Sequence, residues 1–508
     1  MRLLVAALAG LALCLAFAPF NQWWLSLLCP ALLMALWQDA TPRHAAATGF
    51  WFNAGLYGGG TYWLYISIHQ IGNAPVWIAA LVLLAMVSAL AAYGALLGYG
   101  VARLLPARGA TRWLAGLPAA WLLVEWIRGW LLTGFPWQSL GYAHTDTWLA
   151  GMAPVAGVYG VSSLVLLNAG ALMTLWQGAP RERLLAVAVV ALSWGAPLAL
   201  RQVAWTQVAG APVSVAIVQG AVPQDEKWQE GHREQQLAIY HDLTLKALGT
   251  QVIVWPEAAP PDLAQNLQDY LLDLYHQAHA RGSALVIGVL RQSAAGDYYN
   301  SILELGDEAG WYDKQHLVPF TEVIPVPKFA RDWLEFMKLP YEGFSYGAAN
   351  QPPLAAGPLV LEPGICYDDA YGSSNLAMLR TANALVTVTN DGWFGHSTAR
   401  YQHLQIARMR AIEAGRPALR AANDGISAVI GPDGRVQAEA PGYTPYVLRA
   451  TVVPRTGLPP YARTGNWLIM CLAAVTLAAA MASRVRGTFA ASMRSTGPLS
   501  LFSRRSRT

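Results

Sequence analysis

Long apolar segments separated by short loops constrain this chain more than any other feature of its sequence. The 508 residues are 55% hydrophobic and only 13% charged, which is too apolar for a soluble protein of this length. Several apolar segments are long enough to cross about 30 Å of hydrocarbon. Eight such segments predict an α-helical membrane protein with eight spans, of which the first two are short: residues 3–17, 23–37, 45–66, 76–102, 113–132, 148–176, 184–200 and 467–482.

The placement of arginine predicts how these segments are oriented, because basic residues in short loops stay on the cytoplasmic side. If the amino terminus is inside, the predicted outer loops at residues 19–22, 67–75 and 133–147 carry neither lysine nor arginine. We therefore expect both termini in the cytoplasm and residues 201–464 outside the cytoplasmic membrane. The arginines of the predicted inner loops and the tail are Arg43, Arg103, Arg108, Arg112, Arg181, Arg183, Arg484, Arg486, Arg504, Arg505 and Arg507.

Residues 1–18 allow one alternative, a cleaved signal peptide, because Ala16-Phe17-Ala18 has small residues at the spacing of a cleavage site. Pro19 would directly follow the cut, which disfavours cleavage. We expect a retained first span. Cleavage would leave the polar region on the same side of the membrane.

Charge and cysteine usage exclude several classes of function. The net charge of +4 arises from arginines spread over loops and a tail, whereas nucleic-acid binding needs them gathered on one face. The tail at residues 503–507 is suited to contact anionic membrane lipids. Cys14, Cys29 and Cys471 lie in apolar segments, so no disulfide framework is expected. The histidines show no metal-ligand spacing, and we predict neither a metal nor an organic cofactor.

Residues 212–454 form the one long polar stretch, in which short strand patterns alternate with helical patterns. This alternation predicts a layered α/β domain, and about 240 residues suffice to bury its core. Strands are expected at 213–219, 252–255, 284–289, 300–305, 359–365, 384–389, 427–430 and 446–451. Helices are expected at 233–248, 262–281 and 401–414, and a turn at 306–310 closes a hairpin.

Three polar residues of this domain together suffice for covalent acyl transfer. Cys366 and Glu257 each follow an apolar strand pattern, and Lys314 lies between them in the chain. The thiol can attack a carbonyl, the carboxylate can move the thiol proton, and the ammonium can stabilise the developing oxyanion. Each residue also has a simpler interpretation, as a small buried hydrophobe or as a surface charge. An unpaired thiol in an oxidising compartment is unusual, which favours the catalytic interpretation.

Several short motifs surround these residues, and their order and spacing are distinctive. They are Val218-Gln219-Gly220, Pro223-Gln224, Lys227-Trp228, Trp255-Pro256-Glu257, Tyr299-Asn300, Lys314-Gln315-His316-Leu317-Val318-Pro319-Phe320, Gly364-Ile365-Cys366-Tyr367 and Thr389-Asn390-Asp391-Gly392-Trp393-Phe394. They resemble the nitrilase, or carbon-nitrogen hydrolase, superfamily and, more closely and over nearly the whole chain, the apolipoprotein N-acyltransferase family.

The resemblance implies an architecture and a location. Residues 1–205 would hold seven transmembrane helices, residues 206–455 a nitrilase-like αββα sandwich, and residues 456–508 an eighth helix and a basic cytoplasmic tail. The protein would lie in a bacterial inner membrane with its catalytic domain in the periplasm.

The resemblance also implies residue roles. Glu257 would be the general base, Cys366 the nucleophile and Lys314 the cation that faces the oxyanion. Glu322, Tyr367 and Asp368 would support catalysis. The residues that would contact substrate are Trp228, Asn300, Arg331 and Trp393. Asp368 stands where the family usually has glutamate, and Thr321 where it commonly has glycine, so the role of Asp368 stays open.

Residues 325–346 predict an amphipathic helix, because Phe329, Trp333 and Phe336 recur at helical spacing. Packing on the domain core is one interpretation. We favour a membrane-facing arm beside the site that admits acyl chains, with Arg331 near a phosphate.

Two polar pairs receive structural interpretations. Glu125 and Arg128, three apart in an apolar segment, are expected to pair with each other near the outer surface. Asn390 and Asp391 are expected to form a turn and a wall of the site.

The predicted reaction is an N-acyl transfer in two stages. A phospholipid donates an acyl chain to Cys366, and the α-amino group of a diacylglyceryl-cysteine at the amino terminus of an apolipoprotein accepts it. One alternative is a membrane-tethered nitrilase-type amidase with water as acceptor, although a single anchor would suffice for it. Another is a binding protein that kept the fold, which an intact set of three catalytic residues disfavours.

Overall fold

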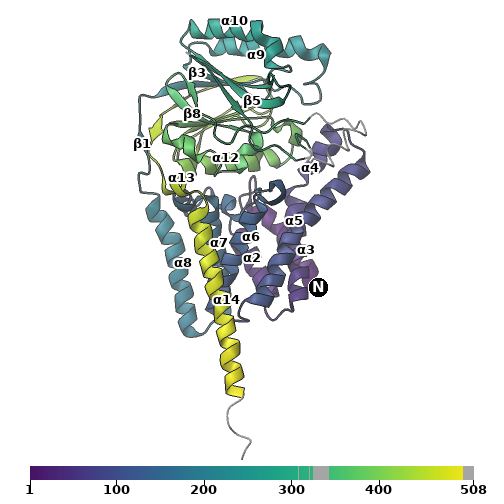
Figure 1. Ribbon diagram of the computed structural model, residues 1–508, viewed down its shortest axis with the longest axis vertical. Helices are drawn as coiled ribbons and strands as arrows, with labels where there is room; N and C mark the ends of the chain where they lie inside the picture. The colour runs from purple at the N-terminus through teal and green to yellow at the C-terminus, as the bar shows by residue number, and fades with distance from the viewer. Residues whose placement is uncertain (307, 320, 324–342, 496–508) are drawn as a thin grey trace, which may run out of the picture.

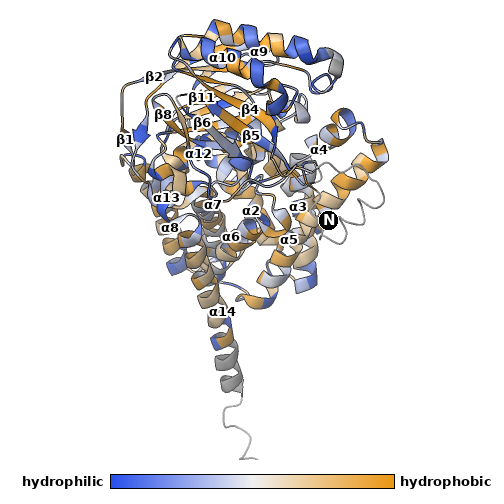
Figure 2. Cartoon of the chain, turned by 45° about the horizontal axis from the view of Figure 1, so that its top comes forward, coloured by the Kyte–Doolittle hydropathy of each residue, from blue (hydrophilic) through white to orange (hydrophobic). Residues whose placement is uncertain are grey.

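The computed structural model describes residues 1–306, 308–319, 321–323 and 343–495. Its two parts, a bundle of helices and a layered α/β domain, are stacked along the long axis of the molecule (Figure 1). Hydrophobic residues predominate in the bundle, whereas hydrophilic and hydrophobic residues alternate along the outermost helices of the α/β domain (Figure 2). The predicted arm at residues 325–346, with Arg331, lies almost entirely outside the described residues.

Helices occupy all eight predicted apolar segments, which lie in the described part of the chain. In this part, four helices are long and apolar enough to cross a membrane, at Val76–Leu104, Trp148–Gln177, Pro180–Leu200 and Trp467–Arg486. The principal helices are α1 (Arg2–Leu13), α2 (Leu25–Leu36), α3 (Pro42–Gly60), α5 (Val76–Leu104), α6 (Leu117–Arg128), α7 (Ala153–Gln177), α8 (Pro180–Leu200) and α14 (Trp467–Ser495), with the short α4 (Trp63–Tyr65) after α3.

Helices α1, α3 and α5 pack so closely that only glycine fits where they cross. A Cβ atom on Gly10 would lie 1.8 Å from the backbone oxygen of Phe52, and one on Gly49 would lie 2.1 Å from that of Gly94. Small residues at helix crossings are typical of membrane proteins, where close packing replaces the hydrophobic effect between helices.

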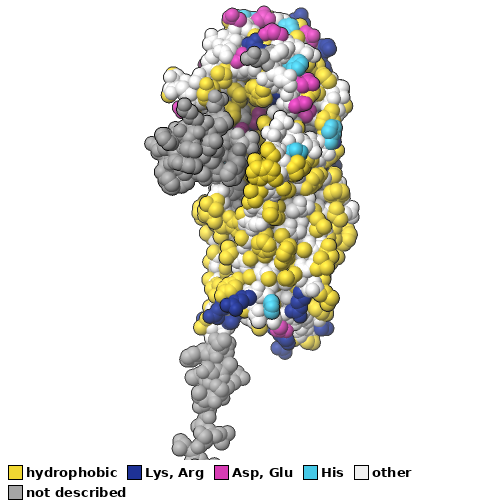
Figure 3. Space-filling view, turned by 90° about the vertical axis from the view of Figure 1, so that its right-hand side faces the viewer, with side chains coloured by type: hydrophobic (Ala, Val, Ile, Leu, Met, Phe, Trp, Pro, Cys, Tyr) yellow, Lys and Arg dark blue, Asp and Glu magenta, His cyan; other side chains and the backbone are white. Residues whose placement is uncertain are grey.

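The predicted inner loops lie together at the end of the bundle away from the α/β domain. On the face shown in Figure 3, hydrophobic side chains cover the bundle, and lysine and arginine gather at this end. Arg484 donates hydrogen bonds to the backbone oxygens of Ala102 and Leu105, at 3.2 and 2.9 Å. Arg108 pairs with Asp39 at 2.6 Å. Loops that are far apart in the sequence therefore share one polar end.

Within the described residues, the α/β domain contains two six-stranded sheets. The first sheet has the order β13-β2-β3-β4-β5-β6, and the second has the order β12-β11-β10-β9-β8-β7. Strands β2, β3 and β4 are parallel, as are β8, β9 and β10. The strands of the first sheet are β2 (Val213–Gln219), β3 (Val252–Val254), β4 (Ala284–Gln292), β5 (Tyr298–Leu305), β6 (Ala309–Asp313) and β13 (Tyr446–Val452). Those of the second are β7 (Leu354–Ala356), β8 (Leu359–Ile365), β9 (Ala384–Thr389), β10 (Ala418–Ala422), β11 (Ala428–Ile430) and β12 (Val436–Glu439).

The two sheets pack face to face and helices cover their outer faces, which makes the predicted four layers. Apolar side chains from both sheets, such as Ile217, Val254, Leu361 and Val388, form the central core. Helices α9 (Arg233–Ala247) and α10 (Gln268–His279) cover the first sheet. Helix α12 (Ala399–Ala414) covers the second, and α13 (Pro460–Thr464) follows this domain. Because α12 lies between the second sheet and the bundle, that sheet is the one nearer the helices (Figure 1).

The sequence did not predict several strands. The predicted hairpin is present as β5 and β6, whereas β7, β10 and β12 carried no strand prediction. Strand β10 is rich in alanine and contains Arg420, a composition that favours helix or surface. A short pair, β1 (Gln207–Val208) with β14 (Arg455–Thr456), joins the two ends of the domain.

Candidate active site

The candidate catalytic residues lie just after strands of both sheets. Glu257 follows β3 and Lys314 follows β6, whereas Cys366 follows β8 and begins a 3₁₀ turn at Cys366–Ala370. Parallel strands of one sheet present their carboxyl ends at the same edge. The packing of the two sheets therefore brings residues that are over a hundred positions apart to one site.

Lys314 lies between two carboxylates. Its Nζ atom is 3.2 Å from Oε1 of Glu257 and 2.9 Å from Oε1 of Glu322. Asn300 donates to the same two oxygens, at 2.7 and 3.1 Å. The backbone nitrogen of Asn390 donates to the other oxygen of Glu257 at 2.9 Å. Burial opposes the charge of Lys314, but Glu257 and Glu322 outweigh it and hold the pKa of the ammonium well above its ordinary value.

Cys366 is held in a backbone conformation that few residues adopt. Its φ angle is +49°, in the left-handed region, and 8% of the residue is exposed. Burial raises the pKa of the thiol well above its ordinary value and the nearby charge of Glu257 adds to this, whereas Lys314 opposes it. The resting residue is therefore a thiol, and it needs a base to become a nucleophile.

Asp368 joins the Lys314 segment to the Cys366 segment. One oxygen accepts hydrogen bonds from the backbone nitrogen and Nδ1 of His316, at 2.8 and 3.1 Å. The other accepts from the hydroxyl of Tyr312 at 3.2 Å and from the backbone nitrogen of Ile365 at 3.1 Å. The carboxylate thus ties together the loops that follow β6 and β8.

Comparison with known proteins supplies the family. The profile of the apolipoprotein N-acyltransferase N-terminal domain matches residues 9–171, and that of carbon-nitrogen hydrolase matches residues 214–457. A protein named apolipoprotein N-acyltransferase from Pseudomonas putida (strain KT2440) is 41% identical over 494 residues, 96% of this chain and 97% of its own. Its namesake from Chromobacterium violaceum is 39% identical over 491 residues, covering 96% of this chain and 95% of its own. This chain belongs to the apolipoprotein N-acyltransferase family.

A solved structure gives a weaker likeness. The crystal structure of a carbon-nitrogen hydrolase from Helicobacter pylori G27 matches 48% of this chain and 89% of its own, at 18% identity and a TM-score of 0.38.

The remaining predicted site residues lie around this centre in different ways. Trp228 is half-exposed, and its ring centroid is 5.9 Å from Nζ of Lys227. The backbone oxygen of Trp393 accepts a hydrogen bond from Ser67 in the bundle at 2.6 Å. The hydroxyl of Tyr367 donates to the backbone oxygen of Gly134 at 3.1 Å. Tyr367 and Trp393 thus connect the site to the helices, and their roles toward substrate stay predictions.

Sequence reasoning missed several buried polar groups beside the site. Lys227 donates from Nζ to the backbone oxygen of Glu257 at 3.2 Å, and burial lowers its pKa to about 8 against the pull of Glu257 and Asp424. His403 contacts the backbone oxygen of Cys366 at 3.1 Å. Arg420 contacts Asp391 at 2.9 Å. No local sequence signal marked these groups, because β10 carries no strand pattern and the partners that neutralise a buried charge come from distant parts of the chain.

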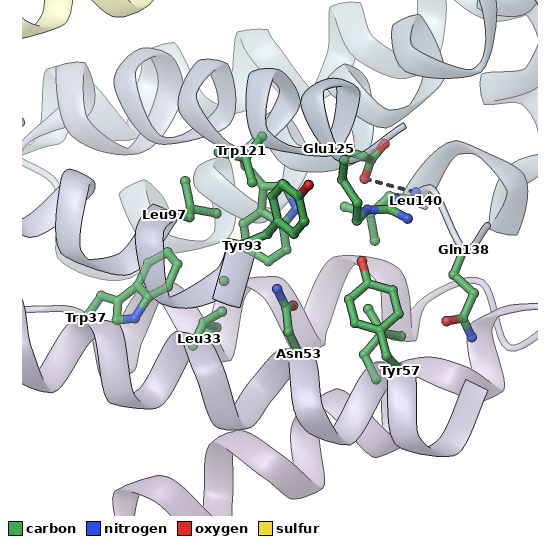
Figure 4. A pocket seen from close by; sticks show the side chains of 14 residues that line it. Leu33, Trp37, Asn53, Tyr57, Tyr93, Leu97, Trp121, Glu125, Gln138 and Leu140 are labelled. Atoms are coloured by element: carbon green, nitrogen blue, oxygen red, sulfur yellow. Dashed lines mark hydrogen bonds between the residues drawn. The ribbon is translucent and has the colours of Figure 1, made fainter. Parts of the chain in front are cut away.

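Glu125 and Arg128 line a pocket inside the bundle (Figure 4). Glu125 accepts from the hydroxyl of Ser162 at 2.6 Å and from the backbone nitrogen of Leu140 at 3.3 Å. Arg128 donates to the backbone oxygens of Phe135 and Trp137. The charges of Glu125 and Arg128 act on each other, and both side chains in addition hold the loop after α6, because backbone groups of a buried loop need partners.

Proposed function

We propose that this protein transfers an acyl chain from a membrane phospholipid, through a thioester on Cys366, to the α-amino group of an amino-terminal diacylglyceryl-cysteine. The name of its relatives, apolipoprotein N-acyltransferase, supports an apolipoprotein acceptor. The observation that carries the chemistry is the position of Lys314 between Glu257 and Glu322 beside a buried thiol. These relatives do not favour the amidase alternative.

In the first stage, Glu257 removes the proton of Cys366, and the sulfur attacks the carbonyl carbon of a phospholipid ester. Lys314 stabilises the negative charge on the carbonyl oxygen of the tetrahedral intermediate. As the intermediate collapses, the carbon-oxygen bond of the ester breaks and the leaving alkoxide takes the proton back from Glu257. The products are a lysophospholipid and a thioester on Cys366.

In the second stage, the α-amino group attacks the thioester carbon and gives a proton to Glu257. Collapse forms the amide and releases the sulfur of Cys366, which regains a proton. Glu257, Glu322 and Lys314 have a formal charge of −1 before each proton transfer and zero after it. Glu322 also accepts from the backbone nitrogen of Val318 at 2.8 Å, which fixes the loop after Lys314.

The same proposal includes the membrane arrangement. Eight spans would place residues 1–205 and 456–508 in and beneath a bacterial inner membrane, with both termini cytoplasmic and residues 206–455 in the periplasm. The gathering of basic residues at the far end of the bundle supports this orientation (Figure 3). The contacts from Ser67 and Gly134 to Trp393 and Tyr367 support a site beside the bundle, where anchored substrates could reach it.

The test is incubation of the purified full chain with acyl-labelled phospholipid in mixed micelles, with and without a diacylated lipopeptide. We expect mass spectrometry to show an acyl group on Cys366 without the peptide, and its transfer to the peptide amine when the peptide is added. Cys366→Ala should show neither, and Cys471→Ala, which changes an exposed cysteine on α14, should behave like the wild type. Release of free fatty acid without acylated peptide would support the amidase instead.

A further inference from the structure

His403 lies on α12 directly behind the candidate nucleophile, with 1% of its side chain exposed. Its Nδ1 atom is 2.9 Å from Oδ1 of Asp391. Its Nε2 atom is 3.1 Å from the backbone oxygen of Cys366 and 3.9 Å from Oδ2 of Asp369. Both ring nitrogens therefore face oxygen atoms.

The chemistry of these oxygens decides the protonation of the ring. A backbone carbonyl only accepts hydrogen bonds, and so does an ionised carboxylate. A neutral imidazole has one N–H group, so one of its nitrogens would direct a lone pair at an oxygen lone pair. An imidazolium donates from both nitrogens and satisfies both contacts.

Asp391 is ionised at this position. It accepts from Nη2 of Arg420 at 2.9 Å and from the hydroxyl of Thr389 at 3.2 Å, in addition to His403. Burial alone would raise the pKa of Asp391, but Arg420 and His403 more than offset it and hold this pKa below its ordinary value.

We propose that His403 is a buried imidazolium and a positioning residue that holds the carbonyl of Cys366. The proposal rests on the assignment of Cys366 as the nucleophile. The left-handed conformation at Cys366 is unfavourable for a residue with a side chain, and a charge-assisted hydrogen bond to its carbonyl offsets that cost. With the carbonyl fixed, the sulfur keeps one direction toward Glu257 and Lys314.

The formal charges of His403, the two carboxylates that face it and the arginine that bridges them balance. Asp369 and Asp391 are negative, and Arg420 and His403 are positive, so the formal sum is zero. Arg420 bridges Asp391 and Asp369, at 2.9 and 3.4 Å. A paired and hydrogen-bonded set of charges can be buried, whereas a single imidazolium could not. Arg410, on the same helix, also acts on Asp369.

The position of His403 also connects the nucleophile to the bundle. Trp137, from the loop after α6, has its ring 5.5 Å from that of His403, and its Nε1 donates to Oε1 of Gln402 at 2.7 Å. The helix that holds the Cys366 carbonyl is therefore itself held by the membrane part.

Three variants test the proposal. His403→Gln keeps one donor but loses the charge, Asp391→Asn loses the acceptor charge, and His241→Gln removes a partly exposed histidine of α9 as the control. Alkylation of Cys366 by iodoacetamide is measured against pH in the full chain, with thermal unfolding as a check of folding. We expect His403→Gln to slow alkylation about tenfold at neutral pH. The pH profile of Cys366 alkylation should move to higher pH, since a positive charge near the thiol is lost. An unchanged rate and profile in folded His403→Gln would overturn the proposal.

A second measurement does not depend on that variant folding. In protein labelled with ¹⁵N in its histidine rings, the His403 signal should show two protonated nitrogens at neutral pH. It is identified as the signal lost in His403→Gln or, if that variant does not fold, the one displaced by Asp391→Asn. One bare ring nitrogen in His403 would overturn the proposal. Both measurements need no acyl transfer, so a failure of the proposed function would leave them unaffected and distinguishable.

Discussion

The two sheets of the α/β domain both deliver charged side chains to the site, but they stabilise these charges differently. From the first sheet come Glu257 and Lys314, which contact each other directly. Near the second sheet, Asp369, Asp391 and Arg420 surround His403 behind Cys366, with side chains at most 7% exposed, and with the imidazolium proposed for His403 their formal charges sum to zero.

This difference in how the charges are stabilised corresponds to the role proposed for the residues of each sheet. A group that accepts and returns protons needs a charge that can change, and Glu257, Glu322 and Lys314 together carry an unbalanced formal charge of −1. A nucleophilic sulfur must point in one fixed direction toward its substrate. A set of buried charges that neutralise one another supplies this rigidity, because breaking any pair would leave an isolated charge in the interior. We therefore expect substitutions of the charged residues of the first sheet to reduce the rate of acyl transfer. Substitutions of the buried charges near the second sheet should mainly reduce the stability of the fold.

The largest expected effect is on the first sheet. Glu257→Gln should reduce acyl transfer by about 10²–10⁴-fold, because the proton of the thiol loses its acceptor. The same change should move the pH profile of Cys366 alkylation to lower pH, since Glu257 raises the pKa of the thiol. Lys314→Met should move it to higher pH, because Lys314 lowers that pKa. Glu234→Gln, an exposed change on α9, is the control. Two shifts in the same direction would contradict this electrostatic account.

The second effect compares one ion pair of each sheet. Arg420→Met should destabilise the protein by about 3–5 kcal/mol, because two buried carboxylates lose their partner. Arg291→Met breaks the pair with Asp313 on the first sheet, where the arginine side chain is 24% exposed, and should cost about 1 kcal/mol. Thermal unfolding of both variants in one detergent measures the difference. Equal losses would mean that the second sheet does not depend on its buried pairs.

A smaller effect is expected where the sheets are joined. Asp368→Ala should reduce acyl transfer about 10-fold to 100-fold, because backbone donors of His316 and Ile365 lose their acceptor. Asp368→Glu keeps the carboxylate and should lose less than about tenfold, since one added methylene mainly strains the packing. Measurement of kcat for acyl transfer by both variants tests this order of losses. A larger loss for glutamate than for alanine would exclude a joining role for the carboxylate.

The smallest effect is expected at the link to the bundle. Tyr367→Phe removes one hydrogen bond to Gly134, worth about 1 kcal/mol, and should reduce acyl transfer about fivefold. Alkylation of Cys366 by a soluble reagent should stay unchanged, because the thiol is not altered. Tyr270→Phe removes a comparable bond on α10, far from the bundle, and is the control. Equal losses in the two variants would show that the link has no specific role.

Much of the fold could be predicted because apolar patterns are local. Strands β2, β8 and β9 have the predicted bounds, and the apolar segments became helices. Strand β10 was missed because its alanines and Arg420 have little intrinsic strand preference, and the neighbours that bury it come from distant parts of the chain. The hydrogen bonds of Glu125 and Arg128 to the loop after α6 were missed for a related reason, since the backbone groups that they bind lie seven or more residues later in the chain.

The sequence by itself determined the membrane character, the α/β domain and its family, because hydropathy, periodicity and motif order are properties of neighbouring residues. Only the tertiary structure decided what surrounds each reactive group: that Lys314 lies between Glu257 and Glu322, that Asp368 joins two loops, and that His403 faces the carbonyl of Cys366. Hydrogen bonds and charge pairs act over a few ångströms of space, and the packing of the two sheets sets those distances.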